Sequence, residues 1–359
     1  MTPVDLSRTV LRAVRRAVDG GELTVSVPGR AVVTIPGPGG CGDYATNIAL
    51  QLARPAGQPP RRVAEILRPH LSGTDGIADV VVTGPGFLNF ILSDGHALPT
   101  ALVAEILASG ARYGFADGPS GQVVQLHAAR EVRAVVVMDA VSRILRSQGA
   151  LVRSSCEGPP AAEWTDVLGV RVDAYGTPEA PAPLDIGIRP VPAPADPVPL
   201  GRDAARWALL HPAAHDRPRI TDEHLVQREG NPLFRVRYAH ARTRALSHNA
   251  AELGFTAVPG ALGDPAAVTE LTTPGDLAPL LADHPRILAQ AAAHQAPDRL
   301  ARHLVTVADA VLAVLPTVLP RGDEKPSAAH RARLALAEAA GTVLAGGLSL
   351  LGIDAPEHL

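Results

Sequence analysis

Lysine is almost absent from this chain of 359 residues: of its 33 lysines and arginines, only residue 325 is a lysine. Mechanisms that need a lysine inside a glycine-rich phosphate loop are therefore excluded. Aromatic residues make up only 3%, so any core must be built from alanine, valine and leucine. The two cysteines, Cys41 and Cys156, form no C-x-x-C pair, which indicates unrelated thiols in a reducing compartment and no zinc site.

The sequence also shows no apolar run that we expect to reach membrane-span length, and no excess of basic residues. We expect no membrane-spanning segment, and the first ten residues lack the apolar stretch of a signal peptide, so the protein is predicted to be cytoplasmic. The formal net charge is −3, so any nucleic-acid binding must come from a local patch of arginines.

Hydrophobic periodicity divides the chain into three predicted domains. Residues 1–117 form an α+β unit with helices over 6–18, 43–54 (capped by Asp43), 60–71 and 98–109, and strands over 22–27, 31–35, 78–83 and 87–92. Residues 118–200 hold one Rossmann-like β-α-β unit, with strands 122–126 and 151–155 around a helix 132–148, and then a Pro-rich linker. Residues 201–359 form an all-α bundle with helices over 202–211, 221–227, 232–254, 276–295, 297–316 and 327–351.

Four short stretches of sequence carry a more specific signal. They are Gly42–Leu50 (GDYATNIAL), Gly84–Phe90 (GPGFLNF), Asn231–Arg242 (NPLFRVRYAHAR, which follows GRDAAR at 201–206) and the closing Leu348–Leu359. Together they resemble the arginyl-tRNA synthetases over roughly three quarters of the chain. The resemblance implies an N-terminal additional domain that contacts the tRNA elbow, and a DALR-type helical domain that binds the anticodon loop.

The resemblance also points to residues that would contact tRNA. In the first segment these are Asn89 and Phe90, although Phe90 would be a core residue if its side of the strand faces inward. In the bundle they lie on one helix, beside an inward stripe of Val236, Ala239, Thr243, Leu246 and Ala250, and are Arg235, Arg237, Tyr238, His240, Arg242 and Arg244. Arginine suits phosphate oxygens and tyrosine can stack on an unpaired base. For Tyr238 and His240, packing inside the bundle is an equally good interpretation.

The middle of the chain departs from the family. A class I synthetase carries a His-x-Gly-His turn at a helix N-terminus, and Ala128, Ala129, Arg130 and Glu131 stand in its place here. The lysine-containing second motif has no counterpart, because no lysine precedes residue 325. The middle is also short, since a synthetase Rossmann domain with its insertions needs roughly 200 residues or more.

The first hypothesis is therefore a tRNA-binding protein without aminoacylation activity, and with no cofactor. Two alternatives stay open: an enzyme that uses arginyl-tRNA as substrate, with His127, Arg130 and Glu131 as the residues to test, and a subunit that pairs with another protein. No metal site is predicted, because Pro212 interrupts the helix between His211 and His215. The Gly37–Gly42 run lacks the ending of a phosphate loop.

Overall fold

The computed structural model describes residues 3–34, 36, 41–92, 97–176, 184–262 and 274–359. Ile35, the glycine run 37–40 and the proline-rich stretch 178–183 of the sequence analysis lie outside the described residues. The chain forms two compact units, Met1–Leu102 (unit 1) and Val103–Leu359 (unit 2). The boundary falls within helix α4 (Ala97–Ser109).

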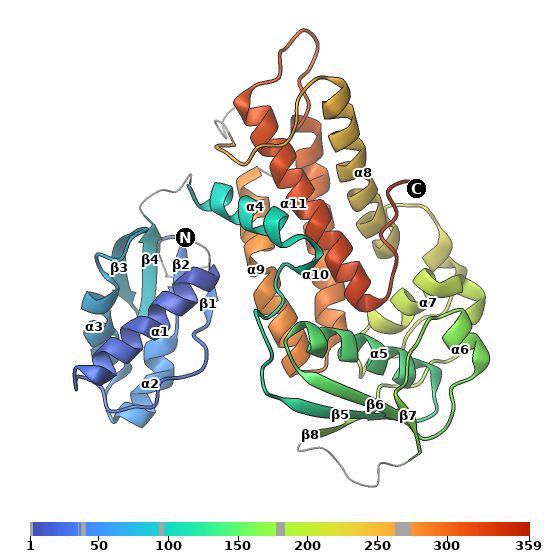
Figure 1. The fold of residues 1–359 in the computed structure, drawn as a ribbon, viewed down its shortest axis with the longest axis horizontal. Coiled ribbons are helices and arrows are strands. Elements are labelled where there is room, and N and C mark those ends of the chain that lie inside the picture. The colour runs from blue at the N-terminus through green and yellow to red at the C-terminus, as the bar shows by residue number, and fades with distance from the viewer. Residues whose placement is uncertain (1–2, 35, 37–40, 93–96, 177–183, 263–273) are drawn as a thin grey trace. The chain divides into compact units, whose positions relative to one another are not determined.

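Unit 1 is a small antiparallel sheet covered by helices (Figure 1). Its strand order is β1-β2-β4-β3, and its core joins α1 side chains such as Leu6 and Val10 to Leu88 and Phe90 of β4. The elements are α1 (Pro3–Asp19), β1 (Val33–Thr34), β2 (Tyr44–Thr46), α2 (Ile48–Ala56), α3 (Pro60–Leu71), β3 (Ile77–Thr83) and β4 (Phe87–Leu92). The α+β architecture expected for this part is confirmed.

Two local predictions in unit 1 are wrong. Residues 22–27 form no strand, although Val25 and Val27 still pack against the core. Asp43 does not cap a helix: its backbone N–H donates to the carbonyl of Phe90, and its carboxylate accepts from the N–H of Leu92 at 2.8 Å. Residues 44–46 therefore pair as β2, and the helix begins only at Ile48.

Unit 2 contains a parallel sheet packed against a helical bundle (Figure 1). The sheet has four strands in the order β7-β6-β5-β8, and α5 packs against β5 and β6 on one side and α7 and α9 on the other. The sheet elements are β5 (Val123–Ala128), α5 (Val132–Ser147), β6 (Leu151–Cys156), α6 (Ala162–Asp166), β7 (Ala174–Tyr175) and β8 (Leu184–Ile188). Four parallel strands replace the two we expected, and β8 lies within the segment predicted to be linker.

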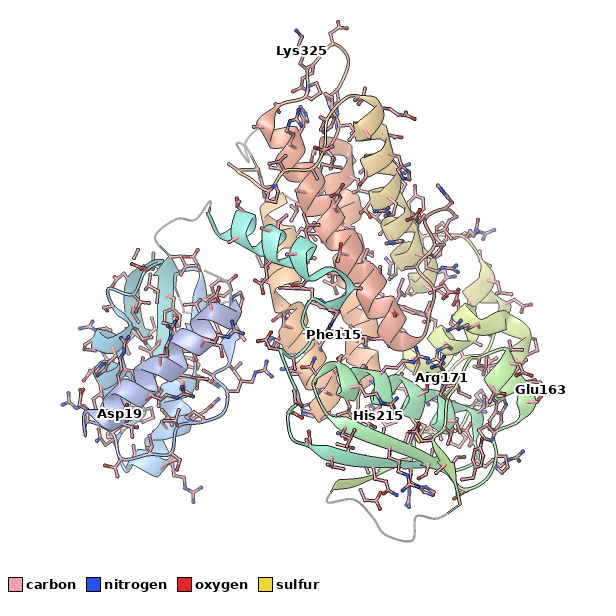
Figure 2. All side chains as sticks on the ribbon, in the orientation of Figure 1. Asp19, Phe115, Glu163, Arg171, His215 and Lys325 are labelled. Carbon is pink, nitrogen blue, oxygen red and sulfur yellow. The ribbon has the colours of Figure 1, made fainter. Side chains whose placement is uncertain are left out.

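The bundle of unit 2 follows the helical prediction closely. Its elements are α7 (Gly201–Leu210), α8 (Pro232–Glu252), α9 (Pro274–Ala293), α10 (Pro297–Val314) and α11 (Ala328–Leu351), with 3-10 turns η1 (Gly110–Arg112), η2 (Val198–Leu200), η3 (Asp222–Leu225) and η5 (Leu315–Thr317). Only a 3-10 turn forms where we expected a helix over 221–227. The lone lysine, Lys325, lies in the loop before α11, at the end of unit 2 opposite the parallel sheet (Figure 2).

Two helical segments of the bundle are long and apolar enough to cross a membrane by length and composition alone. They are Pro297–Thr317 and Ala328–Leu351, so the expectation that no apolar run reaches this length is wrong. Half of the first segment's apolar window and 78% of the second's are buried inside the protein. This burial is typical of core helices, in which apolar side chains face neighbouring helices.

Candidate nucleic-acid interface

Helix α8 carries most of the predicted contacts to RNA, and its start is fixed by a side chain. The Oδ1 atom of Asn231 accepts from the N–H of Leu233 at 3.1 Å, and Pro232 occupies the first helical position. The Nδ2 group of Asn231 also donates to the carbonyls of His224 and Val226. The predicted inward stripe is confirmed, because Val236, Ala239, Thr243, Leu246 and Ala250 are all buried.

Three of the predicted arginines form ion pairs within unit 2. Each extends from α8 to a carboxylate outside that helix: Arg235 to Asp309 at 3.3 Å, Arg237 to Asp203 at 3.4 Å, and Arg244 to Glu357 at 3.1 Å. Partly exposed pairs of this kind contribute roughly 0–1 kcal/mol each. A phosphate can therefore compete for these guanidinium groups at little cost in stability.

A column of stacked side chains lies along the same helix. Phe234 and Tyr238 stack with ring centroids 5.4 Å apart, and the guanidinium of Arg242 lies 6.0 Å from the centre of the Tyr238 ring. Tyr238 and Arg242 are exposed. Among the described residues Arg242 has no carboxylate partner. Sequence reasoning missed Phe234, although its spacing four residues before Tyr238 could have identified it.

His240 lies inside the bundle, as the packing interpretation of this residue requires. Its Nδ1–H donates to the carbonyl of Pro356 at 2.9 Å, and only 6% of the residue is exposed. Burial lowers the pKa of His240, so the ring is neutral at physiological pH. In this conformation it tethers the segment after α11 and does not face solvent.

Asn89 and Phe90 are both buried in unit 1, and neither is accessible to a tRNA base in this conformation. The Asn89 amide nitrogen donates to Val81 O at 3.1 Å and to Thr83 Oγ1 at 2.8 Å. Its oxygen accepts from the backbone N–H of Cys41 at 3.3 Å. The Gly84–Phe90 stretch therefore acts here as a folding motif, in which the amide ties β3 to the loop before β2.

The N-terminus of α5 stands where the first synthetase motif was expected. Glu131 is the N-cap: its Oε2 accepts from the N–H of Ala134 at 2.8 Å, and its Oε1 accepts from the N–H of Ala193 at 3.1 Å. Arg130 points to the carbonyl of Pro159, with Nε at 2.7 Å, and Ala128 is fully buried. The positive end of the helix dipole is thus already neutralised by a carboxylate of the chain itself.

The neighbouring carboxyl end of β5 carries His127, a residue named for the enzyme alternative. His127 is hydrogen bonded through Nδ1 to Ser155 Oγ at 2.9 Å, and Ser155 donates to the carbonyl of Leu126. His215, by contrast, is exposed beside Asp216. In the part of the chain that the structure describes, no group of three or more histidine, cysteine, aspartate or glutamate side chains is arranged to hold a metal ion.

Two fully buried arginines were not identified from the sequence. Arg206 donates to the carboxylate of Asp139 at 2.6 Å and to the carbonyls of Leu168 and Leu351. Arg133 donates only to backbone carbonyls, namely those of Leu209, Val191, Asp216, Pro212 and Ala213. Burial lowers the pKa of both groups. Their partners are far apart in the sequence, so no local pattern indicates them.

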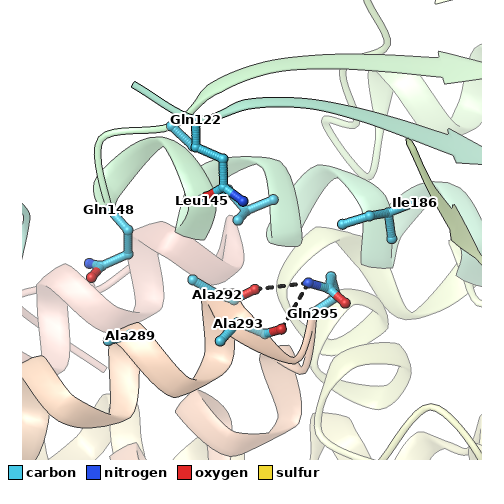
Figure 3. Close-up of a pocket in the computed structure, with 9 residues that line it drawn as sticks. Gln122, Leu145, Gln148, Ile186, Ala289, Ala292, Ala293 and Gln295 are labelled. Carbon is cyan, nitrogen blue, oxygen red and sulfur yellow. Dashed lines mark hydrogen bonds between the residues drawn. The ribbon is translucent and has the colours of Figure 1, made fainter. Parts of the chain in front are cut away.

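A cavity of about 440 Å³ lies between α5, β8 and the end of α9 (Figure 3). Its wall includes Gln122, Leu145 and Ile186, and the amide nitrogen of Gln295 donates to the carbonyls of Ala292 and Ala293. Gln122 precedes β5, so the cavity lies at the amino end of the strand. Open parallel sheets bind ligands at the opposite, carboxyl end.

Two protein-family models match this chain. One, described as arginyl tRNA synthetase N terminal domain, matches residues 6–92. The other, described as DALR anticodon binding domain, matches residues 236–359. The first match covers most of unit 1, and the second covers the bundle from α8 onward.

Curated relatives named arginine–tRNA ligase are similar to parts of the chain or to all of it. The protein of Renibacterium salmoninarum is 42% identical over 43% of this chain and 30% of its own length, and that of Frankia alni is 37% identical over 49% and 32%. The chain thus spans about a third of the length of these two relatives. The protein of Paenarthrobacter aurescens is 26% identical over 556 aligned positions that include the whole of both chains. Because this chain has only 359 residues, long stretches of that relative have no counterpart here.

Solved structures agree with this fold. The arginyl-tRNA synthetase of Thermus thermophilus superposes with a TM-score of 0.67 at 15% identity over the whole of both chains. That of Plasmodium falciparum superposes with a TM-score of 0.63 at 8% identity over 99% of each chain. At such low identities the likeness concerns the fold.

Proposed function

Because the chain belongs to the arginyl-tRNA synthetase family, we propose that it is a tRNA-binding member that no longer activates an amino acid. The bundle would bind the anticodon loop, and unit 1 would contact the tRNA elbow. As a binding protein it needs no cofactor, and we expect it to act in the cytoplasm.

The Phe234–Tyr238–Arg242 column is the observation that carries the RNA-binding half of the proposal. It combines an exposed aromatic ring with an exposed, carboxylate-free guanidinium on the helix that opens the DALR match. Unpaired bases stack on such rings, at about 1–3 kcal/mol per base. Arg235, Arg237 and Arg244 supply further positive charge beside the column, and each can exchange its carboxylate for a phosphate.

Loss of amino-acid activation is supported by the region around α5. The Glu131 carboxylate fills the helix N-terminus that a phosphate would need, and it is bonded both to α5 and to the segment after β8. A phosphate brought to the same place would meet a negative charge. The only lysine lies at the other end of unit 2, so it cannot neutralise a leaving pyrophosphate there.

Filter binding with a transfer RNA and a random RNA of equal length tests the proposed RNA binding. We expect tighter binding of the transfer RNA at physiological salt, and a weakening of roughly tenfold for Tyr238→Ala and for Arg242→Ala. Arg153→Ala is the matched control, because Arg153 is an exposed arginine on β6 and far from α8 in the sequence. Equal affinity for the two RNAs would refute RNA recognition.

Pyrophosphate exchange tests the proposed loss of amino-acid activation. The protein is incubated with arginine, ATP, labelled pyrophosphate and transfer RNA, and a related synthetase serves as the positive control. We expect no exchange above background. Turnover comparable to the control would show that activation survives without the two motifs.

A further inference from the structure

A second cavity in unit 2 is lined by three arginines and two histidines. It has a volume of about 360 Å³ and lies where the end of α7, the loop after it, η3 and α10 meet. Its lining residues are Trp207, Ala208, His211, Pro212, Asp216, Arg217, Arg219, His224 and Arg302. The volume falls in the usual range for small-molecule sites, about 300–1,000 Å³.

Nearby carboxylates neutralise the positive charge of this cavity only in part. Arg217 and Arg219 are exposed and have no ion-pair partner among the described residues, unlike Arg235, Arg237 and Arg244 of α8. Arg302 is paired with Asp298 of its own helix at 3.3 Å, and its side chain is still 54% exposed. Asp216 is the one acidic residue of the lining. In a chain with a net charge of −3, this is a local site for an anion.

The walls of the cavity are held in place by buried contacts. Arg133, which is fully buried, bonds the carbonyls of Pro212, Ala213 and Asp216, so the loop that forms one wall is fixed from inside. Another part of the lining is tied by a 2.9 Å hydrogen bond between His224 Nε2 and the carbonyl of Arg219. A site fixed in this way requires little ordering when a ligand binds.

The cavity also offers a flat ring and an apolar surface. The imidazole of His211 is half-buried and stacks on Trp207, with ring centroids 5.1 Å apart and an interplanar angle of 21°. Ala208 and Pro212 extend the apolar part of the wall. A ligand with one flat aromatic part and one anionic part therefore matches the two kinds of surface.

We propose that this cavity binds a 5′-nucleoside monophosphate, with the phosphate on Arg217, Arg219 and Arg302 and the base against His211 and the apolar wall. The nucleotide is either free in solution or the 5′-terminal residue of an RNA, since both present the same groups. None of its lining residues belongs to α8, whose surface is proposed to bind tRNA, so either proposal can fail without the other.

The pKa of His211 is lowered, in part by the cations around it. Burial lowers its pKa first, and the charges of Arg302 and His224 lower it further, against a smaller opposing effect of Asp298. A bound phosphate would offset these cations. The His211 resonance in an NMR titration would then move when the nucleotide is added, and its pKa would rise toward the ordinary value.

Calorimetric titration of the full chain with AMP tests the proposal, with adenosine, inorganic phosphate and a 5′-phosphorylated RNA oligonucleotide as the other probes. We expect AMP to bind at least tenfold more tightly than adenosine or phosphate, because only AMP uses both surfaces. The oligonucleotide separates the two sources of the nucleotide: tighter binding than AMP indicates an RNA end, and weaker binding indicates a free nucleotide.

Variants locate the binding. Arg217→Ala with Arg219→Ala should weaken AMP binding at least tenfold, whereas Tyr238→Ala should leave the affinity for AMP within twofold. Arg228→Ala, an exposed arginine outside the cavity lining, is the matched control and should leave AMP binding unchanged. Absence of AMP binding at millimolar concentration, equal binding of AMP and phosphate, or an unaffected double variant would each overturn the proposal.

Discussion

Replacing Asp139 by asparagine is expected to destabilise unit 2 by about 3–5 kcal/mol, because the change leaves a buried positive charge without its counterion. The Asp139 carboxylate lies 2.6 Å from Arg206, whose side chain has no exposed surface. The other hydrogen bonds of Arg206 go to the carbonyls of Leu168 and Leu351, which carry no net charge. Since domains of this kind are stable by about 5–15 kcal/mol, the loss would be about a fifth or more of the total.

Urea unfolding followed by tryptophan fluorescence measures this loss of stability in unit 2. Both tryptophans, Trp164 and Trp207, belong to unit 2, and Trp207 is fully buried, so the signal reports unit 2 alone. Arg143→Met is the matched control. Arg143 bonds the same carboxylate at 3.0 Å but its side chain is 28% exposed, so we expect a loss of at most about 1 kcal/mol.

Two outcomes would refute this reasoning about Asp139. If the free energy of unfolding of Asp139→Asn lies within about 1 kcal/mol of that of the unmodified protein, the buried charge of Arg206 does not need the carboxylate as its counterion. If Arg143→Met lowers the free energy of unfolding as much as Asp139→Asn does, the exposure of an arginine does not decide how much its ion pair with Asp139 stabilises unit 2. In the first case the stability of unit 2 would have to come from elsewhere than this ion network.

Three further predictions concern other residues. Burial lowers the pKa of His303 to about 4, so below pH 6.5 the unfolded chain binds more protons than the native one; stability should fall by roughly 2 kcal/mol from pH 7 to pH 5 through this group, and His303→Phe should flatten the pH profile of the urea midpoint. An unchanged profile would contradict this. Glu131→Ala removes the N-cap of α5 and should cost about 1 kcal/mol in the same assay, whereas no loss would mean that water replaces the carboxylate. Gly86→Ala places a methyl group 2.7 Å from the backbone of Pro60 at a φ of +138°, so the thermal midpoint of unit 1, followed by circular dichroism, should fall by more than about 4 °C; Gly73→Ala, at a φ of +80° with open space, is the control for backbone strain alone.

Sequence reasoning succeeded where a segment's own pattern decides its structure. The helix Pro60–Leu71 begins and ends where the periodicity of Val63, Leu67 and Leu71 predicts, because one apolar face is enough to define it. The bundle helices α8 and α11 follow for the same reason. Their N-caps, Asn231 and Ser327, were not named from the sequence.

It failed where distant contacts override the local pattern. Asp43 has the residue type and position of an N-cap, but β4 recruits its backbone and carboxylate. The strand β8 is only five residues long and stands in proline-rich sequence, so its pairing with β5 could not be foreseen. For the α8 surface, residue types identified the cations but not their ion pairs, because Asp203, Asp309 and Glu357 lie tens of residues away.

The Arg206 network also has a consequence for how the chain folds during synthesis. The network joins residues 139, 168, 206 and 351, so it cannot form completely before residue 351 has emerged from the ribosome. Unit 1 needs only the first 102 residues and is free to fold long before that point. During translation, the nascent chain therefore carries a folded unit 1 and an unfolded unit 2. Arg206, which is buried in the folded protein, is still in contact with water at this stage. This interval is when unit 2 is most exposed to chaperones and proteases.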